Sequence, residues 1–384
     1  MAREFDIIVY GSTGYTGRLV AEHLLKTYGA AGDLKWAMAG RNEAKLKEVR
    51  AEIGAPDSVP LVIANADDQA SLTAMAKRAS VIISTAGPYQ LYGSGLVEAC
   101  ANEGTDYVDL TGEPNWIHAM RIHEDAAKKS GARIVFSCGF DSIPTDIGAW
   151  FVEEAAKAKF GAYAPRVRGR VRGMKGGASG GTVASGQATM MAMQKDPSLM
   201  GVLMNPFAHT APYLGVAQPD GNTPYEDKVT GSWVGPFMMA MINTKAVHRT
   251  NYILGNPWGT DFQYDEMVML PGPPGQGAAP TFEMNNELKP GDGPTKQERE
   301  EGFYDILLIA EMPDGRTVRA HCKGDMDPGY GSTSKMLGES AVCLLRDVPR
   351  SVTPGGLYST GGAMAAQLVP RLAKNAGVVF AVED

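Results

Sequence analysis

The stretch Phe5-Asp6-Ile7-Ile8-Val9-Tyr10, followed at once by Gly11-Ser12-Thr13-Gly14-Tyr15-Thr16-Gly17, decides the fold of this chain. The apolar first part predicts a buried strand, and the apolar spacing of residues 18–25 predicts a helix directly after the glycines. A strand, a glycine-rich turn and a helix in this order are typical of a dinucleotide-binding fold. Gly11 permits the tight turn, Gly14 lets the backbone approach a pyrophosphate, and Gly17 lets the helix pack against the sheet. We therefore predict that residues 11–17 hold a pyrophosphate at the amide groups of the first helix.

The residue that ends the second predicted strand indicates which dinucleotide is preferred. In a fold that prefers NAD, an acidic residue at this place accepts hydrogen bonds from the ribose hydroxyls. Here residues 35–40 lead into Arg41. Its guanidinium can make paired, charge-assisted hydrogen bonds to a 2′-phosphate, which a carboxylate would repel. The alternative is that Arg41 is only a surface charge at the start of the next helix. We predict NADPH as the cofactor.

Length, charge and cysteine content limit the possible classes of protein. With 384 residues the chain is longer than chains that usually form a single hydrophobic core, so two domains are expected. The 36 basic and 43 acidic residues give a net charge of −7, which offers no electrostatic case for nucleic-acid binding. The cysteines form no CxxC pair, so we expect buried thiols rather than disulfides or a zinc site: Cys100, Cys138, Cys322 and Cys343. The six histidines show no metal-ligand spacing, and no metal site is predicted.

The N-terminus and the apolar runs carry no pattern that predicts targeting or a membrane span. The first predicted strand begins at residue 5, which leaves no room for a signal or transit peptide before it. No apolar run approaches the about 20 residues that a membrane span requires. A cytoplasmic protein is the expectation.

Strand-like and helix-like segments alternate up to about residue 150. This alternation predicts an α/β fold with a doubly wound parallel sheet. In such a sheet the ligand crevice lies at the carboxyl ends of the strands. We therefore expect the loops that begin at Gly11, Arg41, Thr85, Asp109 and Ser137 to meet at one place.

The pattern changes after about residue 150 and predicts a second domain with both strands and helices. Residues 166–173 alternate with period two and predict an antiparallel strand, with Arg166, Arg168, Arg170 and Arg172 on one solvated face. Residues 184–193 predict a helix. Residues 304–311 and 317–323 predict a hairpin, and residues 332–345 predict a long helix.

Five further segments carry a resemblance to a known family. They are Ser84-Thr85-Ala86-Gly87-Pro88-Tyr89, Asp106-Tyr107-Val108-Asp109-Leu110-Thr111-Gly112-Glu113, Gly139-Phe140-Asp141-Ser142-Ile143-Pro144-Thr145-Asp146, Ser179-Gly180-Gly181-Thr182 and Tyr330-Gly331-Ser332-Thr333-Ser334-Lys335-Met336-Leu337-Gly338-Glu339-Ser340. With the glycine turn, they make the chain resemble the saccharopine dehydrogenase-like oxidoreductases, and specifically their trans-acting enoyl reductase branch. The resemblance spans nearly the whole length.

This resemblance implies a domain organisation and an activity. It implies a Rossmann domain that binds NADP over residues 1–148 and an inserted α+β domain over residues 149–330, for substrate binding and dimerisation. A C-terminal helical segment, residues 331–384, is expected to return to the Rossmann domain. The branch is associated with NADPH-dependent reduction of a carbon–carbon double bond in polyketide-derived lipids.

The loop after the fourth strand supplies the remaining cofactor residues and one catalytic candidate. Thr85, Ala86, Gly87 and Pro88 are expected beside the nicotinamide ribose, because Gly87 permits close backbone approach and Pro88 fixes the turn. Tyr89 is then expected to project into the crevice, where it could stack on the nicotinamide or donate a proton. The alternative is a buried tyrosine whose hydroxyl is bonded to a local carbonyl group.

Carboxyl groups on neighbouring loops are the other candidates. Asp141 follows the strand at residues 133–137, and its apolar neighbour Phe140 should raise the pKa of its carboxyl group, so that Asp141 can act as an acid. The alternative is that Asp141 braces its loop through backbone amides. For Asp109 a bracing role between strands is favoured, and for Glu113 the role of a charge at a helix N-terminus.

The substrate is left open by the sequence. Methionines concentrate within residues 190–204 and 238–241, and they could line a lipid pocket, fill a core or form a subunit interface. The leading hypothesis is an NADPH-dependent enoyl reductase that acts on an apolar small molecule or an acyl thioester. Peripheral contact with a membrane or lipid and a homodimer are also open. The alternatives are a saccharopine-type amino-acid dehydrogenase, which would need convergent arginines, and a non-catalytic nucleotide-binding protein associated with lipid.

Overall fold

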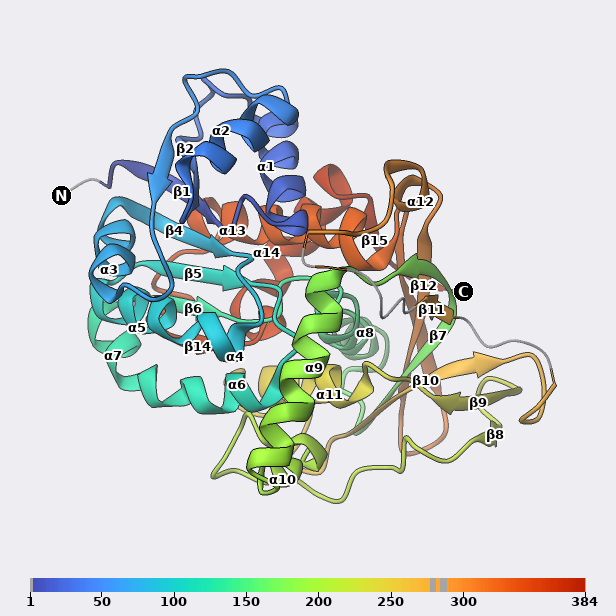
Figure 1. Ribbon diagram of the computed structural model, residues 1–384. Helices are drawn as coiled ribbons and strands as arrows, with labels where there is room; N and C mark the ends of the chain where they lie inside the picture. Colours follow the sequence, from blue (N-terminus) through green and yellow to red (C-terminus); the bar gives the residue numbers. More distant parts are fainter. Residues whose placement is uncertain (1–2, 277–280, 284–288, 290, 384) are drawn as a thin grey trace.

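The protein consists of two sheets with helices packed around and between them (Figure 1). The computed structural model describes residues 3–276, 281–283, 289 and 291–383. In Figure 1 the first sheet lies on the left and the second on the right, and helix α9 (Gly180–Lys195) runs in front of the boundary between them.

The first sheet has seven strands in the order β14-β6-β5-β4-β1-β2-β3, and every pairing in it is parallel. Its strands are β1 (Phe5–Tyr10), β2 (Trp36–Gly40), β3 (Leu61–Ile63), β4 (Ala79–Ser84), β5 (Asp106–Asp109), β6 (Arg133–Val135) and β14 (Gly356–Tyr358). The order reverses at β1, which lies between β4 and β2. A reversal of this kind creates a crevice at the carboxyl ends of the strands. The predicted doubly wound Rossmann sheet is therefore confirmed.

Helices cover both faces of this sheet, because successive strand residues point to opposite sides and both sides are apolar. Ile7 and Val9 face a core that includes α1 and α13, whereas Ile8 and Tyr10 face a core that includes α3 and α5. The helices of this half are α1 (Tyr15–Tyr28), α2 (Glu43–Glu52), α3 (Gln69–Arg78), α4 (Tyr89–Tyr92), α5 (Ser94–Glu103), α6 (Pro114–Met120), α7 (Glu124–Ser130) and α13 (Thr333–Arg346).

The second sheet is mixed and runs in the order β15-β13-β12-β7-β10-β9-β8, with β11 paired to β7. Its strands are β7 (Arg166–Gly177), β8 (Tyr225–Asp227), β9 (Ser232–Pro236), β10 (Gln263–Leu270), β11 (Thr281–Glu283), β12 (Phe303–Glu311), β13 (Thr317–Gly324) and β15 (Val378–Glu383). The predicted hairpin is confirmed as β12 and β13. Strand β7 is antiparallel to β12, as predicted, but parallel to β10.

One face of the second sheet packs against helices and forms the core of this half. A Cβ placed on Gly148 of α8 would lie 2.9 Å from the Leu308 side chain of β12, so the helix lies directly on the sheet. The helices outside the first sheet are α8 (Ile143–Phe160), α9, α10 (Leu199–Met204), α11 (Ala240–Ile253), α12 (Lys296–Glu300) and α14 (Thr360–Asn375).

The arginines of β7 lie on the opposite face, but they are not solvated as predicted. Arg170 is fully buried and forms ion pairs with Asp227 and Asp265 at 2.8 and 2.9 Å. Arg168 pairs with Glu311, and Arg172 pairs with Asp305 and Glu383. Arg166 pairs with Asp265. The period-two pattern places the four arginines on one face of the strand, but it does not indicate the acidic partners that other strands bring to this face.

The C-terminal residues contribute to both halves. Helix α13 packs against α1 and the first sheet, as the resemblance implied. Besides its helices this segment contains two strands, because β14 extends the first sheet and β15 forms an edge of the second. The three residues of β14 are too few to show a strand period.

Two further expectations concern the whole chain. All four cysteines are buried free thiols, as predicted. Within the described ranges, no helix combines the length and the apolar character needed to cross a membrane.

Candidate active site

The glycine turn between β1 and α1 is built by very close backbone contacts. Gly11 has φ +90°, which side-chain-bearing residues rarely adopt, and a Cβ there would lie 2.7 Å from Thr85 Oγ1. A Cβ on Gly17 would lie 2.2 Å from the carbonyl oxygen of Gly11, which leaves no room for one. These glycines are therefore required by the backbone itself. Gly14 is different, because its φ of −83° and ψ of 166° are extended and its nearest neighbour, Gly11 O, lies 3.3 Å from a Cβ.

The start of α1 fits the pyrophosphate of a dinucleotide. In the part of the chain that the structure describes, the amide groups of residues 15–17 donate to no backbone or side-chain acceptor. The first turn carries no acidic residue that would compete for them. Unpaired amides at a helix N-terminus attract anions, and Gly14 leaves the approach free of a side chain.

Two residues of this turn direct their side chains away from such a ligand. Ser12 is buried, and its hydroxyl donates to Val9 O at 2.6 Å while its amide donates to Ala39 O. The Tyr15 ring packs edge-on against Tyr330 at 5.1 Å, and its hydroxyl bonds to Pro294 O and Arg299. Of these two predicted cofactor residues, only the Tyr15 amide remains available. Thr13 and Thr16 are partly exposed at the turn.

Arg41 lies where the sequence places it, directly after β2. A Cβ on the preceding Gly40 would lie 3.8 Å from Thr13 Cγ2, so the end of β2 adjoins the glycine turn. Arg41 is exposed and makes no ion pair with any described residue, and its neighbour Asn42 caps α2 through the amide of Lys45. The start of α2 is thus capped by Asn42 and not by Arg41.

The loop after β4 forms the second wall of the crevice. Thr85 joins it to the first wall, because its amide and hydroxyl donate to Tyr10 O at 2.9 and 3.0 Å. Ala86 is partly exposed, Gly87 is exposed and Pro88 is buried. The exposed backbone of Gly87 is the part of this loop that a ligand in the crevice can reach.

Tyr89 does not project into the crevice, contrary to the expectation. It is 4% exposed, its ring packs on Trp116 with centroids 5.2 Å apart, and its hydroxyl donates to Ser84 O at 2.9 Å. Burial raises the pKa of the Tyr89 hydroxyl well above its usual range. Tyr89 is therefore a buried tyrosine bonded to a local carbonyl group, as the alternative prediction has it. This position does not favour a catalytic role for Tyr89.

Asp109 and Glu113 hold the crevice loops together. Asp109 accepts from the amides of Ser137 and Thr111 and from the Tyr107 hydroxyl, so the predicted brace is confirmed. Burial raises the pKa of the Asp109 carboxyl group to about 7. Glu113 accepts from the first amides of α4, at Tyr89 and Gln90, and also from the Ser185 hydroxyl of α9 at 2.8 Å. Glu113 is thus the expected charge at a helix N-terminus, and it also ties α9 to the crevice.

Asp141 offers a carboxyl group at the carboxyl end of β6. Its Oδ2 would lie 3.3 Å from a Cβ on Gly112, so it faces the loop after β5. Its Oδ1 is inaccessible to solvent and has no hydrogen-bond partner among the described residues. The alternative, that Asp141 braces its loop, requires backbone amides that donate to its carboxyl group. In the described part of the chain no amide donates to it. Burial raises the pKa of Asp141 to about 7, the direction expected from its apolar surroundings.

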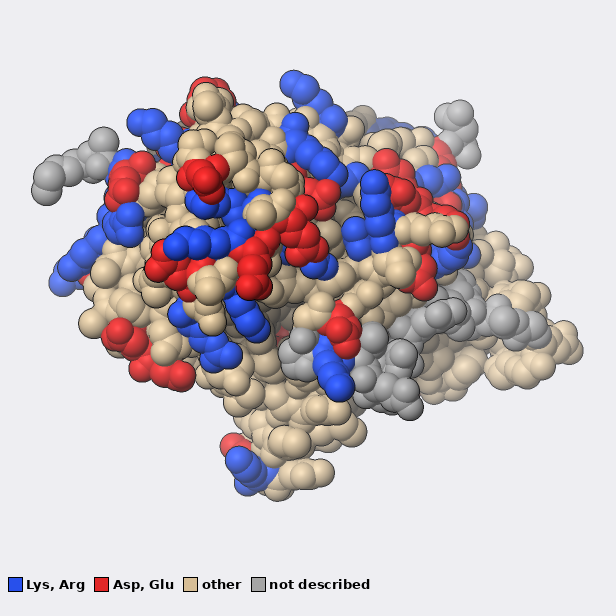
Figure 2. Space-filling model, turned by 45° about the horizontal axis from the view of Figure 1, so that its top comes forward, with Lys and Arg blue, Asp and Glu red and all other residues tan. Residues whose placement is uncertain are grey.

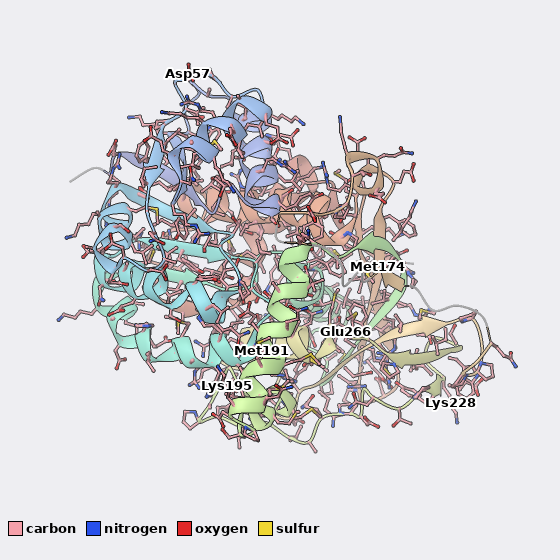
Figure 3. The ribbon with its side chains drawn as sticks, viewed as in Figure 1. Asp57, Met174, Met191, Lys195, Lys228 and Glu266 are labelled. Atoms are coloured by element: carbon pink, nitrogen blue, oxygen red, sulfur yellow. The ribbon has the colours of Figure 1, made fainter. Side chains whose placement is uncertain are left out.

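The second domain supplies acidic and amide groups that the sequence reasoning missed. Glu266 of β10 is fully buried and accepts from Asn243 Nδ2 of α11 at 2.8 Å and from the Tyr264 hydroxyl at 3.0 Å. Figure 3 shows Glu266 in the middle of the molecule, between the two sheets. A signal was present, because Glu266 has the same strand parity as the buried Tyr264 and Val268.

A cavity of about 30 Å³ is lined by residues from both halves, including Ile242, which precedes Asn243 in α11. Its walls include apolar Ile117, Phe136 and Ile242, together with Arg121 and Arg249. Arg249 donates to His209 O, Leu357 O and Glu124, and Arg121 donates to Ala211 O. The Ile242 side chain also lies 3.3 Å from a Cβ on Gly112, so the cavity adjoins the Asp141 loop.

The methionine-rich region lies on the surface rather than in a closed pocket. Its exposed side chains lie on or beside α9, α10 and α11: Met190, Met191, Met200, Met204, Met238 and Met241. Figure 2 shows charged side chains gathered over the upper part of one face and few over its lower part.

Comparison with known proteins agrees with this fold. Residues 7–135 match the family model described as the saccharopine dehydrogenase NADP binding domain. A saccharopine dehydrogenase (L-Glu forming) from Saccharomyces cerevisiae has the same fold, with a TM-score of 0.55 at 12% identity, over 99% of this chain and 99% of that one. The matching family model and the glycine turn therefore define an NADP-binding domain of the dehydrogenase type.

Curated relatives narrow the family. A trans-acting enoyl reductase of Mycobacterium bovis (strain BCG / Pasteur 1173P2) is 34% identical, over 98% of this chain and 97% of its own length. A trans-acting enoyl reductase of Mycobacterium leprae (strain TN) is 32% identical over 98% and 97%. The chain belongs to the saccharopine dehydrogenase-like oxidoreductases, in their trans-acting enoyl reductase branch.

Proposed function

We propose that the protein uses NADPH to reduce the carbon–carbon double bond of an apolar acyl group, conjugated to the carbonyl of a thioester. The observation that carries this proposal is the carboxyl group of Asp141, which has no brace among the described residues and a pKa raised to about 7 at the edge of the crevice. Such a group can hold a proton at neutral pH and give it to a carbon atom. The names of the two mycobacterial relatives support the same reaction class.

The residues of the crevice divide the work of binding and proton transfer. NADPH, when bound, supplies the hydride that adds to the β-carbon. The amides of residues 15–17 bind its pyrophosphate, and Arg41 binds its 2′-phosphate. The Gly112 amide, which donates to no described acceptor, lies beside Asp141 and can stabilise the negative charge that develops on the thioester oxygen. Asp141 then donates its proton to the α-carbon.

The charges of the second domain favour this substrate over the saccharopine type. A substrate with several carboxylates needs arginines that are free to bind them. The arginines of β7 are instead paired with acidic residues. Arg249 at the cavity is engaged by two carbonyl groups and Glu124. An uncharged acyl chain needs no free arginine to bind it.

The test follows the absorbance of NADPH with two substrate classes. One is a 2-enoyl thioester of coenzyme A, and the other is lysine with a keto acid. We expect oxidation of NADPH with the thioester only. We expect Asp141→Asn to slow it by about 10²–10⁴-fold, the usual contribution of a positioned acid, with unchanged affinity for NADPH. The rate should fall as the pH rises through about 7, because the acid must be protonated.

The control is Asp57→Asn, which alters an exposed acid at the far end of the Rossmann domain (Figure 3). It should leave both the rate and the pH profile unchanged. An unchanged rate in Asp141→Asn would reject the role of that carboxyl group. Turnover with lysine and a keto acid would favour the saccharopine type, and binding of NADPH without turnover of either substrate would favour a non-catalytic protein.

A further inference from the structure

We propose that helix α9 is a lid over the crevice, which hydroxyl groups hold against the Rossmann domain and which swings away to admit the acyl thioester. The movement is a property of the protein alone, whereas its use by an acyl thioester rests on the proposed function. Helix α9 follows β7 of the second sheet along the chain. It lies beside the loops at the carboxyl ends of β4 and β5 (Figure 1).

Three residues of α9 bind the Rossmann domain through their hydroxyl groups and form what we call the hydroxyl seam: Thr182, Ser185 and Thr189. Their spacing of three and four residues places them on one face of the helix. Thr182 Oγ1 lies 2.5 Å from the Tyr330 hydroxyl, and Ser185 donates to Glu113 Oε1 at 2.8 Å. Gln90 Nε2 of α4 donates to Thr189 Oγ1 at 3.0 Å. The seam therefore holds α9 at three separate places.

The hydroxyl seam lies beside the groups that form the crevice. At one end, the Tyr330 ring packs on Tyr15, the first residue of α1, with centroids 5.1 Å apart. In the middle, Ser185 Oγ lies 3.8 Å from the position of a Cβ on Gly87. Gly87 carries the exposed backbone of the loop after β4. Helix α9 thus extends from the glycine turn to the second wall of the crevice, and it borders the approach of a substrate to this wall.

Helix α9 has few of the apolar contacts that fix a helix in place. Its buried residues are Gly180 and Val183, whereas 11 of the 14 residues of α13 are buried. The three hydrogen bonds of the hydroxyl seam are only partly buried. Water can replace the partners of such groups, so the net contribution of each bond to stability is small. Segments with few buried apolar contacts move at a low cost in free energy, and lids belong to such segments.

The first turn of α9 allows the helix to change direction without unfolding. Ser179 Oγ caps the helix by accepting from the amides of Gly181 and Thr182 at 3.2 and 3.4 Å. These cap bonds lie within one short segment, so they can persist when the hydroxyl seam breaks. Small residues at the end of an element commonly absorb the φ and ψ changes of a lid. Gly180 and Gly181 provide such a hinge, and α9 can move as one helix.

The movement can be tested without cofactor or substrate, by the distance between two spin labels. The labels are attached at Asp57→Cys in the Rossmann domain and Met191→Cys on α9, two exposed positions that Figure 3 shows. The four native cysteines are buried, which restricts labelling to the introduced ones. The seam variant combines Thr182→Val, Ser185→Ala and Thr189→Val, which remove the three hydroxyl groups. We expect its ratio of the longer to the shorter distance to exceed that of the otherwise wild-type protein by about 10-fold or more.

The control places the second label at Lys228→Cys, an exposed position beside the second sheet (Figure 3). The distance from position 57 to position 228 should be the same with and without the hydroxyl seam, because α9 moves by itself. An unchanged distance from position 57 to position 191 in the seam variant would overturn the proposal. A change in both distances would also overturn it, because the two halves would then separate as wholes.

The use of the lid by the substrate has a separate test. Gln90→Cys and Thr189→Cys provide two thiols that a short bismaleimide can join across the hydroxyl seam, and the cross-link is formed after NADPH has bound. We expect the enoyl thioester to oxidise this NADPH about 10-fold more slowly, or slower still, than in either single-cysteine variant treated with the same reagent. Equal rates would reject the role in admission. If no enoyl thioester reacts with the wild type, the proposed function fails, and the spin-label distances still decide whether α9 moves.

Discussion

The glycine turn and the outer face of β7 both carry polar groups, but the two regions arrange these groups in opposite ways. At the turn, the first amides of α1 and the guanidinium of Arg41 have no partner among the described residues. On β7 every arginine has an acidic partner, and Arg170 and Arg172 have two each. The first region presents unpaired groups to a ligand, whereas the second uses its charges to join strands. Pairing, rather than polarity, separates a binding site from a structural one.

The largest expected effect is on the glycine turn. Gly14→Val should abolish NADPH binding, because the new side chain would occupy the path of the pyrophosphate. The backbone at Gly14 is extended, so the fold should be kept. Gly186→Val in α9 is the control, because a Cβ there meets no atom within 4 Å. Fluorescence of bound NADPH and thermal unfolding measure the two effects, and unchanged affinity in Gly14→Val would refute this site.

The next effect is on β7. Arg170→Met should lower the free energy of unfolding by about 3–5 kcal/mol, because it leaves the buried Asp227 without its cation and Asp265 with Arg166 alone. Arg168→Met, at a partly exposed pair with Glu311, should lower it by about 0–1 kcal/mol. Denaturant unfolding measures both. Equal losses would mean that burial does not distinguish these arginines.

A smaller effect tests the preference for the phosphorylated cofactor. Arg41→Ala should weaken the binding of NADPH by about 1.5–3 kcal/mol, which is the contribution of hydrogen bonds to a charged group. The binding of NADH should stay almost unchanged. Titration calorimetry with both nucleotides measures the difference. Asn42→Ala is the control, because Asn42 caps α2 and should affect stability but not this preference. Equal losses of affinity for NADPH and NADH would mean that Arg41 is only a surface charge and does not bind the 2′-phosphate.

The smallest effect concerns the edge of the second sheet. Hydrogen bonds from Arg172 lower the pKa of Glu383 below its usual 4.5. A lowered pKa stabilises the folded state above the unfolded value, and this contribution is lost as the pH falls through the folded value. Glu383→Gln should therefore reduce stability by about 0–1 kcal/mol at pH 7 and converge with the wild type in acid. Unfolding measured from neutral to acidic pH tests this, and a constant difference would contradict it.

The sequence was sufficient for the features that depend on local pattern. The glycine spacing predicted the turn, and the alternation of apolar segments predicted the parallel sheet, because both follow from backbone geometry. The sequence could not predict which side chains would find internal partners. Tyr89 was expected in the crevice, but the carbonyl group of Ser84 holds its hydroxyl in the core. The partners of Arg170 come from β8 and β10, 57 and 95 residues away.

Glu266 was missed for the same reason. Its buried position depends on the packing of α11 against β10, where Asn243 donates to its carboxyl group. Nothing in the spacing of the chain relates residues 243 and 266. The sequence does show that this carboxyl group lies on the apolar face of a strand. Such a residue should be considered a candidate site residue as readily as one in a motif.

The strands β14 and β15 have a consequence for how this protein forms in the cell. One extends the Rossmann sheet and the other borders the second sheet, and both are supplied by residues 356–383. Until residues 356–383 have been synthesised, the nascent chain on the ribosome lacks one strand of each sheet. Neither half can then be completed during translation in the order of its synthesis, so both should reach their final structures together, late in folding.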